Sequence, residues 1–312
     1  MSQDRPALSL VIPLYNEAES LQELHAVLTT VLGSYPDRYE VIYVDDGSTD
    51  GSFDRLEALR DADPRVTVVR LRCNQGKTVA LVAGFREARG EVIVTLDADL
   101  QDDPTEIPRL LSRLDEGYDL VSGWKVDRQD PWSRRILSRL FNAVTSRMTG
   151  VDLHDLNCGF KAYRRAVVAE LRLQGDLHRF IPVLAGWRGF RIAEVEVRHH
   201  PRRYGRSKYG AGRITRGFFD LLTVLLLTRY TTRPLHLFGM IGALLAAVGL
   251  GVLGYLAIGW LFGQWIGGRP LLLLAVLMVV GGMQLVSLGL LAEMIVYGSN
   301  PESPPPIDLI LK

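Results

Sequence analysis

Residues 91–102 read EVIVTLDADLQD, and this stretch decides the fold. Its first part is apolar and β-branched, which predicts a buried strand from Glu91 to Leu96. Asp97, Asp99 and Gln101 follow that strand directly. In an open α/β sheet, ligands bind outside the carboxyl ends of the strands, and two acids there can share a hard divalent cation that holds a diphosphate. An isolated Asp-x-Asp equally fits a solvated acidic turn, so the rest of the chain must decide.

Two earlier segments follow the same plan. The apolar runs Leu8–Ile12 and Glu40–Val44 each predict a strand that leads into polar residues. Asn16 and the apolar residues after it at helical spacing predict a helix with Asn16 as its N-cap. Val66–Leu71 is a further predicted strand and Thr78–Ala88 the next helix. This alternation predicts an α/β fold that is Rossmann-like, with a mostly parallel sheet and helices on both faces.

Composition narrows the class of protein. The 312-residue chain has a formal net charge of +1, so no bulk electrostatic attraction to nucleic acid is expected. Its two cysteines, Cys73 and Cys158, are too few for a disulfide framework and suit a reducing compartment as free thiols. The segment MSQDRPALSL lacks the basic-then-apolar pattern of a signal peptide and leads straight into the first predicted strand.

Two long apolar stretches lie in the last third of the chain. Leu235–Phe262 contains no charged residue, and Pro270–Val296 contains one, Glu293. Each exceeds the roughly 20 residues that span a bilayer, and the short link Gly263–Arg269 makes them a hairpin. Arginines gather just before the first stretch, at Arg213, Arg216, Arg229 and Arg233. The link carries one arginine, so the positive-inside rule places the preceding domain in the cytoplasm.

The segment between the domain and the hairpin has a mixed character. Ile214–Tyr230 is apolar but interrupted by charges, which predicts a helix lying in the membrane surface. A core helix of the preceding domain is the alternative. We therefore expect four parts: an α/β domain at 1–212, an interfacial helix at 213–233, a two-span hairpin at 234–298 and a cytoplasmic tail at 299–312.

Six short motifs occur in an order and spacing that together are very specific. They are VIPLYNE, VDDGSTD, RCNQGKTVALVAGF, LDADLQDDP, DLNCGFKAYRR and RRYGRSKYG. The first four resemble the family 2 glycosyltransferases of the GT-A fold. The last two narrow the resemblance to the branch that loads a sugar onto polyprenyl or dolichyl phosphate. The resemblance covers roughly residues 7–212.

The resemblance implies a reaction and its partners. It implies inverting, metal-dependent transfer of a sugar from a UDP- or GDP-hexose to undecaprenyl or dolichyl phosphate. The enzyme would work at the cytoplasmic face of the cell (inner) membrane, with the bilayer as a further partner and without nucleic acid. Members of this branch include monomers and tetramers, so a homo-oligomer stays open.

The resemblance also assigns the metal site and the catalytic residues. Asp99 and Gln101 look like ligands of Mg²⁺ or Mn²⁺, with Asp97 close by. Asp155 matches a family aspartate near the sugar, where it would orient the sugar, act as a base or stabilise the oxocarbenium-like centre. Capping a turn with Asn157 is the alternative for that residue. Asp97, Asp99 and Asp155 are thus the candidate catalytic set.

Further positions match those that hold the nucleotide sugar in this family. They are Pro13, Tyr15, Glu17, Asp46, Lys77, Asp97, Ala98, Arg202 and Lys208. Lys77 stands at a predicted helix start, where backbone N–H groups favour anions. As alternatives, Pro13 merely ends a strand, Tyr15 packs in the core, and the basic stretch at Arg202 and Lys208 is attracted to anionic lipid.

The acceptor needs positioning more than a general base, because a phosphate oxygen is already an anion near neutral pH. The resemblance implies that Lys125, Arg134 and Ser138 bind the lipid phosphate. Arg134 and Ser138 are four residues apart, so on a helix they share one face. A basic amphipathic helix that docks on the bilayer is the alternative for this segment.

Two other functions fit parts of the sequence. A processive polysaccharide synthase has a similar domain but carries a Q-x-x-R-W motif and more spans. The nearest approach here is Gly186–Arg188, which lacks the glutamine. A non-catalytic membrane scaffold or lipid carrier would not need the intact set of Asp97, Asp99 and Gln101. Nucleotide release in the presence of lipid phosphate separates a transferase from such a carrier.

Overall fold

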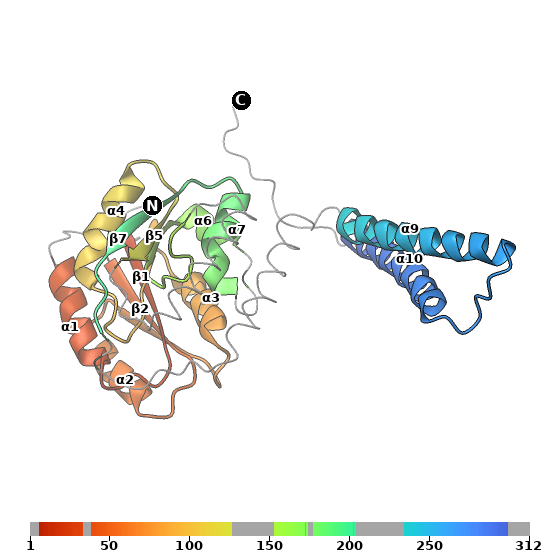
Figure 1. Cartoon of the computed structure of the whole chain (residues 1–312). Helices are drawn as coiled ribbons and strands as arrows, with labels where there is room; N and C mark the ends of the chain where they lie inside the picture. The colour runs from red at the N-terminus through yellow and green to blue at the C-terminus, as the bar shows by residue number, and fades with distance from the viewer. Residues whose placement is uncertain are drawn as a thin grey trace. The chain divides into compact units, whose positions relative to one another are not determined.

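The computed structural model describes residues 6–33, 39–126, 153–171, 173, 177–201, 203 and 234–298 of the chain. These residues belong to two compact units, an α/β domain and a pair of long helices (Figure 1). The predicted interfacial helix and the predicted tail lie outside the described residues. The four-part division of the chain therefore stays a prediction.

In the described part of the domain, seven strands form one sheet in the order β3-β2-β1-β4-β6-β5-β7. They are β1 Leu8–Leu14, β2 Tyr39–Asp45, β3 Val66–Arg70, β4 Val92–Thr95, β5 Leu120–Lys125, β6 Lys161–Arg164 and β7 Ile192–Val197. β6 is antiparallel to both neighbours, and the other pairs are parallel. β4 and β5 therefore run in the same direction, and their carboxyl ends lie at one edge with those of β1 and β2.

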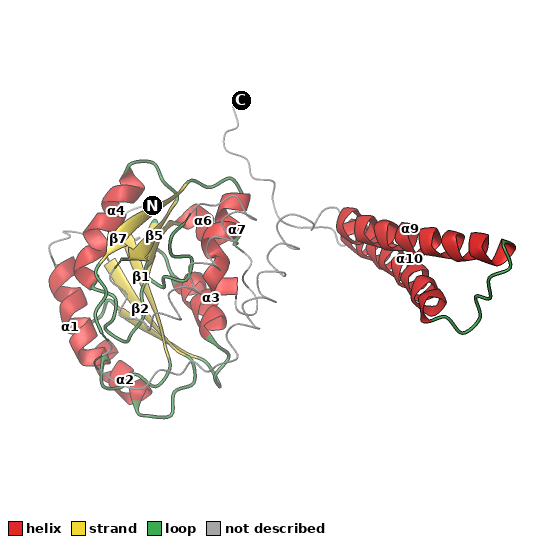
Figure 2. Ribbon diagram, viewed as in Figure 1, coloured by secondary structure: helices red, strands yellow, loops and turns green. Residues whose placement is uncertain are grey.

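Helices cover both faces of the sheet (Figure 2). They are α1 Leu21–Leu32, α2 Ser52–Ala62, α3 Lys77–Glu87, η1 Pro104–Glu106, α4 Ile107–Asp115, α6 Arg165–Glu170, η2 Leu177–Phe180 and α7 Ile181–Trp187. Helices α1, α2 and α4 pack into one apolar core, and α3, α6 and α7 into the other. Leu10 and Ile12 of β1 enter the first core and Val11 the second. Strands buried on both faces read as unbroken apolar runs, and the predicted α/β fold is confirmed.

The first helix begins later than predicted. α1 starts at Leu21 with Ser20 at the N-cap position, so the prediction of Asn16 as the cap is wrong. Asn16 has a left-handed φ of 52°. Its backbone N–H donates to Ser48 Oγ at 2.8 Å, and its Oδ1 accepts from the Thr49 N–H at 2.8 Å. This bonding to the turn after β2 competes with capping, as asparagine side chains often do.

The second unit consists of α9 Pro234–Leu261 and α10 Pro270–Gly298. Their mean hydropathy reaches 2.3 and 2.4, and both helices are long and apolar enough to cross a membrane. Only 17% and 11% of these apolar windows are buried, unlike the core helices of a soluble domain. A Cβ on Gly242 would lie 2.5 Å from the Gly282 carbonyl oxygen, so glycines let the two backbones approach closely.

Glu293 of α10 caps the first turn of α9. Its Oε2 accepts a hydrogen bond from the Leu235 backbone N–H at 3.0 Å. The first four N–H groups of a helix lack intrahelical acceptors, and an unmet N–H in apolar surroundings is costly. The single carboxylate of α10 thus serves as a cap supplied by the neighbouring helix.

We expect Glu293→Ala to lower the unfolding free energy of the full-length chain in detergent by about 1–2 kcal/mol, as for a lost cap. Glu293→Gln keeps an acceptor oxygen and loses only the charge, so it should cost about 0.3–1 kcal/mol. Thermal denaturation of the three proteins measures both effects. A Glu293→Ala protein as stable as wild type would contradict the capping role.

Candidate active site

The carboxyl edge of the sheet brings together the turns after β1, β2 and β4. The Asp46 backbone N–H donates to the Leu14 carbonyl at 2.9 Å, which joins the first two turns. Tyr15 and Glu17 are half-buried in the first turn, and Asp97 begins the third. The structure therefore places the predicted donor and metal residues of three separate motifs at one edge.

Asp46 holds the loop that precedes α3. Its Oδ1 accepts from the Gln75 N–H at 2.7 Å and its Oδ2 from the Gly76 N–H at 2.9 Å. Burial raises the pKa of this carboxyl, and the two N–H groups partly offset the shift. Gly47 has φ 72°, and a Cβ there would lie 2.6 Å from the Cys73 carbonyl carbon. Asp46 thus fixes the start of α3, and its contact with a donor stays a prediction.

Lys77, the first residue of α3, forms an ion pair with Asp97 through its ammonium. Their side chains are 23% and 33% exposed, so both reach the surface of the edge. Gly159 lies against this pair: a Cβ there would be 2.8 Å from Asp97 Oδ2 and 2.9 Å from Lys77 Nζ. Thr95 Oγ1 donates to the Gly159 carbonyl at 2.8 Å and holds it there.

The turn after β4 has an unusual backbone conformation at Leu100. This leucine has φ 57°, a left-handed conformation that is rare for a bulky residue. Its side chain packs against the core formed by α1, α2 and α4. The Gln101 backbone N–H donates to Asp99 Oδ1 at 3.2 Å, which ties the side chain of one predicted metal ligand to the backbone of the other. Gln101 Nε2 donates to the His200 carbonyl at 3.4 Å, which leaves its amide oxygen to accept.

The oxygen donors at this turn fit a divalent cation that also binds substrate. Mg²⁺ in phosphate-transfer sites is typically held by one or two carboxylates together with phosphate oxygens and water. Asp99 is buried and Gln101 half-buried, next to the more exposed Asp97. Within the described ranges no group of three His, Cys, Asp or Glu side chains could hold a metal by itself. A cation held at this turn would therefore complete its coordination with phosphate oxygens of the substrate and with water.

Asp155 is buried beside the same edge and held from two sides. Its Oδ1 accepts from the Asn157 N–H at 3.2 Å, which is the predicted turn cap. Its own N–H donates to Glu194 Oε1 at 3.0 Å, and the His154 N–H donates to Glu194 Oε2 at 2.8 Å. Glu194 on β7 thus fixes the position of Asp155. A catalytic role for Asp155 stays a prediction.

The remaining predicted residues differ in accessibility. Pro13 is buried within β1, and Ala98 is 2% exposed. A donor could therefore contact their backbone atoms, or their side chains after neighbouring residues move. Lys125 lies at the end of β5 with its ammonium 2.6 Å from Asp102 Oδ1. The other predicted contacts lie outside the described residues: Arg134, Ser138, Arg202 and Lys208.

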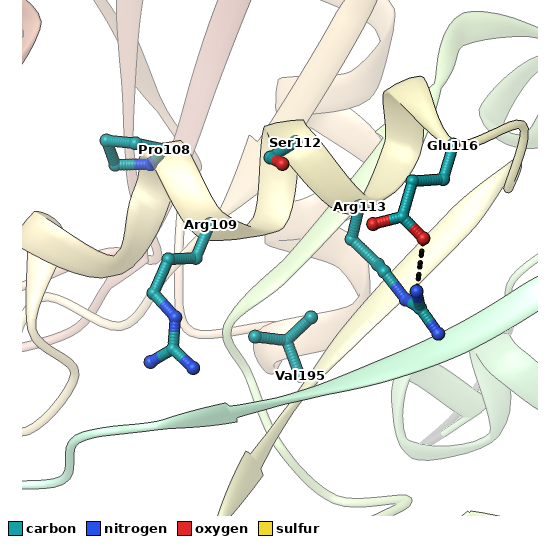
Figure 3. A pocket seen from close by; sticks show the side chains of 6 residues that line it. All are labelled: Pro108, Arg109, Ser112, Arg113, Glu116 and Val195. Carbon is teal, nitrogen blue, oxygen red and sulfur yellow. Dashed lines mark hydrogen bonds and ion pairs between the residues drawn. The ribbon is translucent and has the colours of Figure 1, made fainter.

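A shallow depression of roughly 350 Å³ lies on α4 and β7 (Figure 3). It is lined by Pro108, Arg109, Ser112, Arg113, Glu116 and Val195. Arg113 pairs with Glu116 at its rim. No predicted site residue lines this depression, and its two arginines lie on an exposed helix face. We assign the chemistry to the carboxyl edge instead.

Comparison with known proteins identifies the family of the chain. Residues 9–172 match glycosyl transferase family 2. The chain is 41% identical to dodecaprenyl-phosphate galacturonate synthase of Rhizobium johnstonii, over 92% of this chain and 87% of that protein. It is 40% identical to undecaprenyl-phosphate 4-deoxy-4-formamido-L-arabinose transferase of Pseudomonas aeruginosa, over 92% and 84%. Glucosyl-3-phosphoglycerate synthase from Mycobacterium tuberculosis shares the fold, with TM-score 0.54 and 22% identity over 71% of this chain and 80% of that one.

The mixed, mostly parallel sheet has the GT-A fold, which it shares with glucosyl-3-phosphoglycerate synthase. The chain belongs to glycosyl transferase family 2, and its relatives act on polyprenyl phosphate. The predicted family and the predicted enzyme class are both confirmed.

We expect Gly159→Ala to displace the Lys77–Asp97 pair, because the added methyl would overlap both partners. Displacement of these side-chain ends should weaken binding of the predicted nucleoside diphosphate at least ~5-fold, about 1 kcal/mol of binding free energy. Calorimetric titration with UDP and with GDP, each with Mn²⁺, measures this loss. Gly254→Ala is the matched control, because nothing lies within 4 Å of a Cβ at that position in α9. Wild-type affinity in Gly159→Ala would show that the pair does not contribute to donor binding.

Proposed function

We propose that this glycosyltransferase moves one hexose-type sugar from a nucleoside diphosphate to polyprenyl phosphate at the cytoplasmic face of the cell membrane. One observation carries the proposal: two relatives named for polyprenyl-phosphate substrates match 92% of the chain. A match of that extent reaches beyond the α/β domain and includes most of the apolar hairpin. A soluble acceptor would not require the apolar helices α9 and α10, most of which lie within the match to these relatives.

The carboxyl edge would hold the donor. We propose that Asp99 and Gln101 bind Mg²⁺ or Mn²⁺ with Asp97 close by, in keeping with a fold neighbour that binds Mn²⁺ together with UDP-glucose. When bound, the ion neutralises the charge that develops on the leaving diphosphate. Lys77 stands at the N-terminus of α3, where helix N–H groups also favour anions. A diphosphate beside Asp97 would give the Lys77 ammonium a second anion to bind.

The transfer step needs no proton acceptor. An anionic oxygen of the lipid phosphate attacks the anomeric carbon, the bond from that carbon to the diphosphate oxygen breaks, and the nucleoside diphosphate leaves. Attack from the opposite side inverts the anomeric configuration. We propose that Arg134 and Ser138 position the lipid phosphate and that buried Asp155 orients the sugar or stabilises its positive charge.

A donor screen tests this function. The purified full-length chain would receive UDP and GDP sugars, galacturonate among them, with and without a short polyprenyl phosphate. We expect release of one nucleoside diphosphate that depends on the lipid phosphate. Release that is equal without the lipid would indicate donor hydrolysis, and no release with any donor would favour a non-catalytic carrier.

Loss of the Asp99 carboxylate should remove much of the stabilisation of the leaving group. We expect Asp99→Asn to lower turnover at least ~100-fold, the scale of losing one such electrostatic contact, with the fold intact by circular dichroism. Asp54→Asn is the matched control, because Asp54 is an exposed residue of α2. Undiminished turnover in Asp99→Asn, or in EDTA, would exclude the proposed metal site.

The two native thiols provide a test of membrane orientation. Cys73 is exposed, whereas Cys158 is buried, and burial raises the pKa of its thiol to about 12, so it should not react. In intact cells, an impermeant maleimide should label Gln264→Cys, an exposed position in the link between α9 and α10. Cys73 should react only after permeabilisation. The reverse order of labelling would place the domain on the outer side.

A further inference from the structure

Three side chains from distant parts of the chain meet where the Asp97–Gln101 turn ends. Lys125 of β5 and Asp102 form an ion pair, with Nζ 2.6 Å from Oδ1. Nδ1 of His199, two residues after β7, lies 3.7 Å from the same oxygen. Asp102 and His199 also form an antiparallel backbone bridge. We call Asp102, Lys125 and His199 the buried anchor.

The anchor is enclosed by protein. The side chain of Asp102 is 1% exposed, that of Lys125 11% and that of His199 18%. A buried charge is costly unless an opposite charge compensates it. Asp102 Oδ2 has no hydrogen-bond partner in the part of the chain that the structure describes. Without Lys125, the weaker contact with His199 is the only ion pair that the carboxylate would keep among the described residues.

The anchor joins two segments that the proposed function assigns to the donor. Asp102 directly follows Gln101, a predicted metal ligand. The His200 N–H donates to the Gln101 carbonyl at 2.8 Å, and Gln101 Nε2 donates back to the His200 carbonyl. Arg202, the predicted diphosphate contact, follows His200 by two residues in the sequence. The ion pair of Asp102 and Lys125 therefore holds the turn that carries Gln101 against His200. His200 precedes the predicted donor contact Arg202 in the sequence.

We infer that Lys125 is a positioning residue for donor binding: it compensates the buried charge of Asp102 and so fixes the turn that carries Asp99 and Gln101. This inference rests on the proposed function and replaces the lipid-phosphate contact predicted for Lys125. A lysine whose ammonium is engaged and mostly buried is poorly placed to meet a lipid headgroup.

Charge-removing variants of the full-length chain in detergent test the inference. Lys125→Met leaves Asp102 buried without its cation, and we expect ~10-fold or greater weakening of UDP or GDP binding in the presence of Mn²⁺, within the range of coupled contacts. The double variant Lys125→Met with Asp102→Asn removes both charges and should recover most of that affinity. The apparent KM for a short polyprenyl phosphate should change less than ~2-fold in the double variant.

Arg65 and Asp63 provide a matched control pair. Arg65 Nη2 lies 2.8 Å from Asp63 Oδ2, the Asp63 side chain is 8% exposed, and the pair precedes β3 at the amino edge of the sheet. Arg65→Met should lower the melting temperature and leave nucleotide affinity unchanged. The comparison separates loss of donor positioning from general destabilisation.

Three results would overturn the inference. The first is wild-type nucleotide affinity in Lys125→Met with a raised KM for polyprenyl phosphate, which would return Lys125 to the acceptor site. The second is no recovery of affinity in the double variant, which would exclude charge compensation. The third result applies if Lys125→Met does not fold, when the double variant is compared with Asp102→Asn alone. A double variant that folds but binds nucleotide as weakly as Asp102→Asn would then overturn the inference. Failure of the wild-type chain to bind either nucleotide would instead defeat the proposed function, and the inference with it.

Discussion

The proposed donor site depends on one strained turn. Leu100 adopts a left-handed φ of 57°, which costs about 1–3 kcal/mol for a residue of this kind and persists only where the surroundings enforce it. Its side chain packs into the apolar core, and Asp102 beyond it is tied to Lys125. Within this turn the Gln101 backbone N–H donates to Asp99 Oδ1. Without these restraints the two oxygen donors would not be pre-organised for a cation.

Two acids at this edge are each balanced by a cation from another element. Asp97 faces Lys77 of α3, and Asp102 faces Lys125 of β5. Fixed charges in a partly dry site act more strongly than the same charges in water and need no reorganisation when the reaction occurs. The differing exposure gives the pairs different roles, because Lys77 and Asp97 reach the surface whereas Asp102 does not. We propose that the exposed pair meets the donor and that the buried pair holds the turn.

Much of the fold was predictable because its strands are buried on both faces and its helices alternate with them. Asp97, Asp99 and Lys77 could be singled out from the sequence because they stand close to a strand end or a helix start, and their roles stay predictions. Gly159 and Glu194 were missed, because their importance comes from contacts with residues far away in the chain, which no periodicity records. The partner of Lys125 was missed for the same reason. The start of α1 was predicted too early because Asn16 can either cap a helix or bond to the turn after β2, and in the structure it bonds to Ser48 and Thr49.

The proposed enzyme carries out a single, inverting transfer from nucleotide to lipid. Its most direct test is NMR spectroscopy of the products formed from an accepted donor and a short polyprenyl phosphate. We expect equal amounts of nucleoside diphosphate and a lipid phosphodiester carrying one sugar, with anomeric configuration opposite to that of the donor. Retained configuration, a chain of several sugars on one lipid, or free sugar without a lipid product would contradict it.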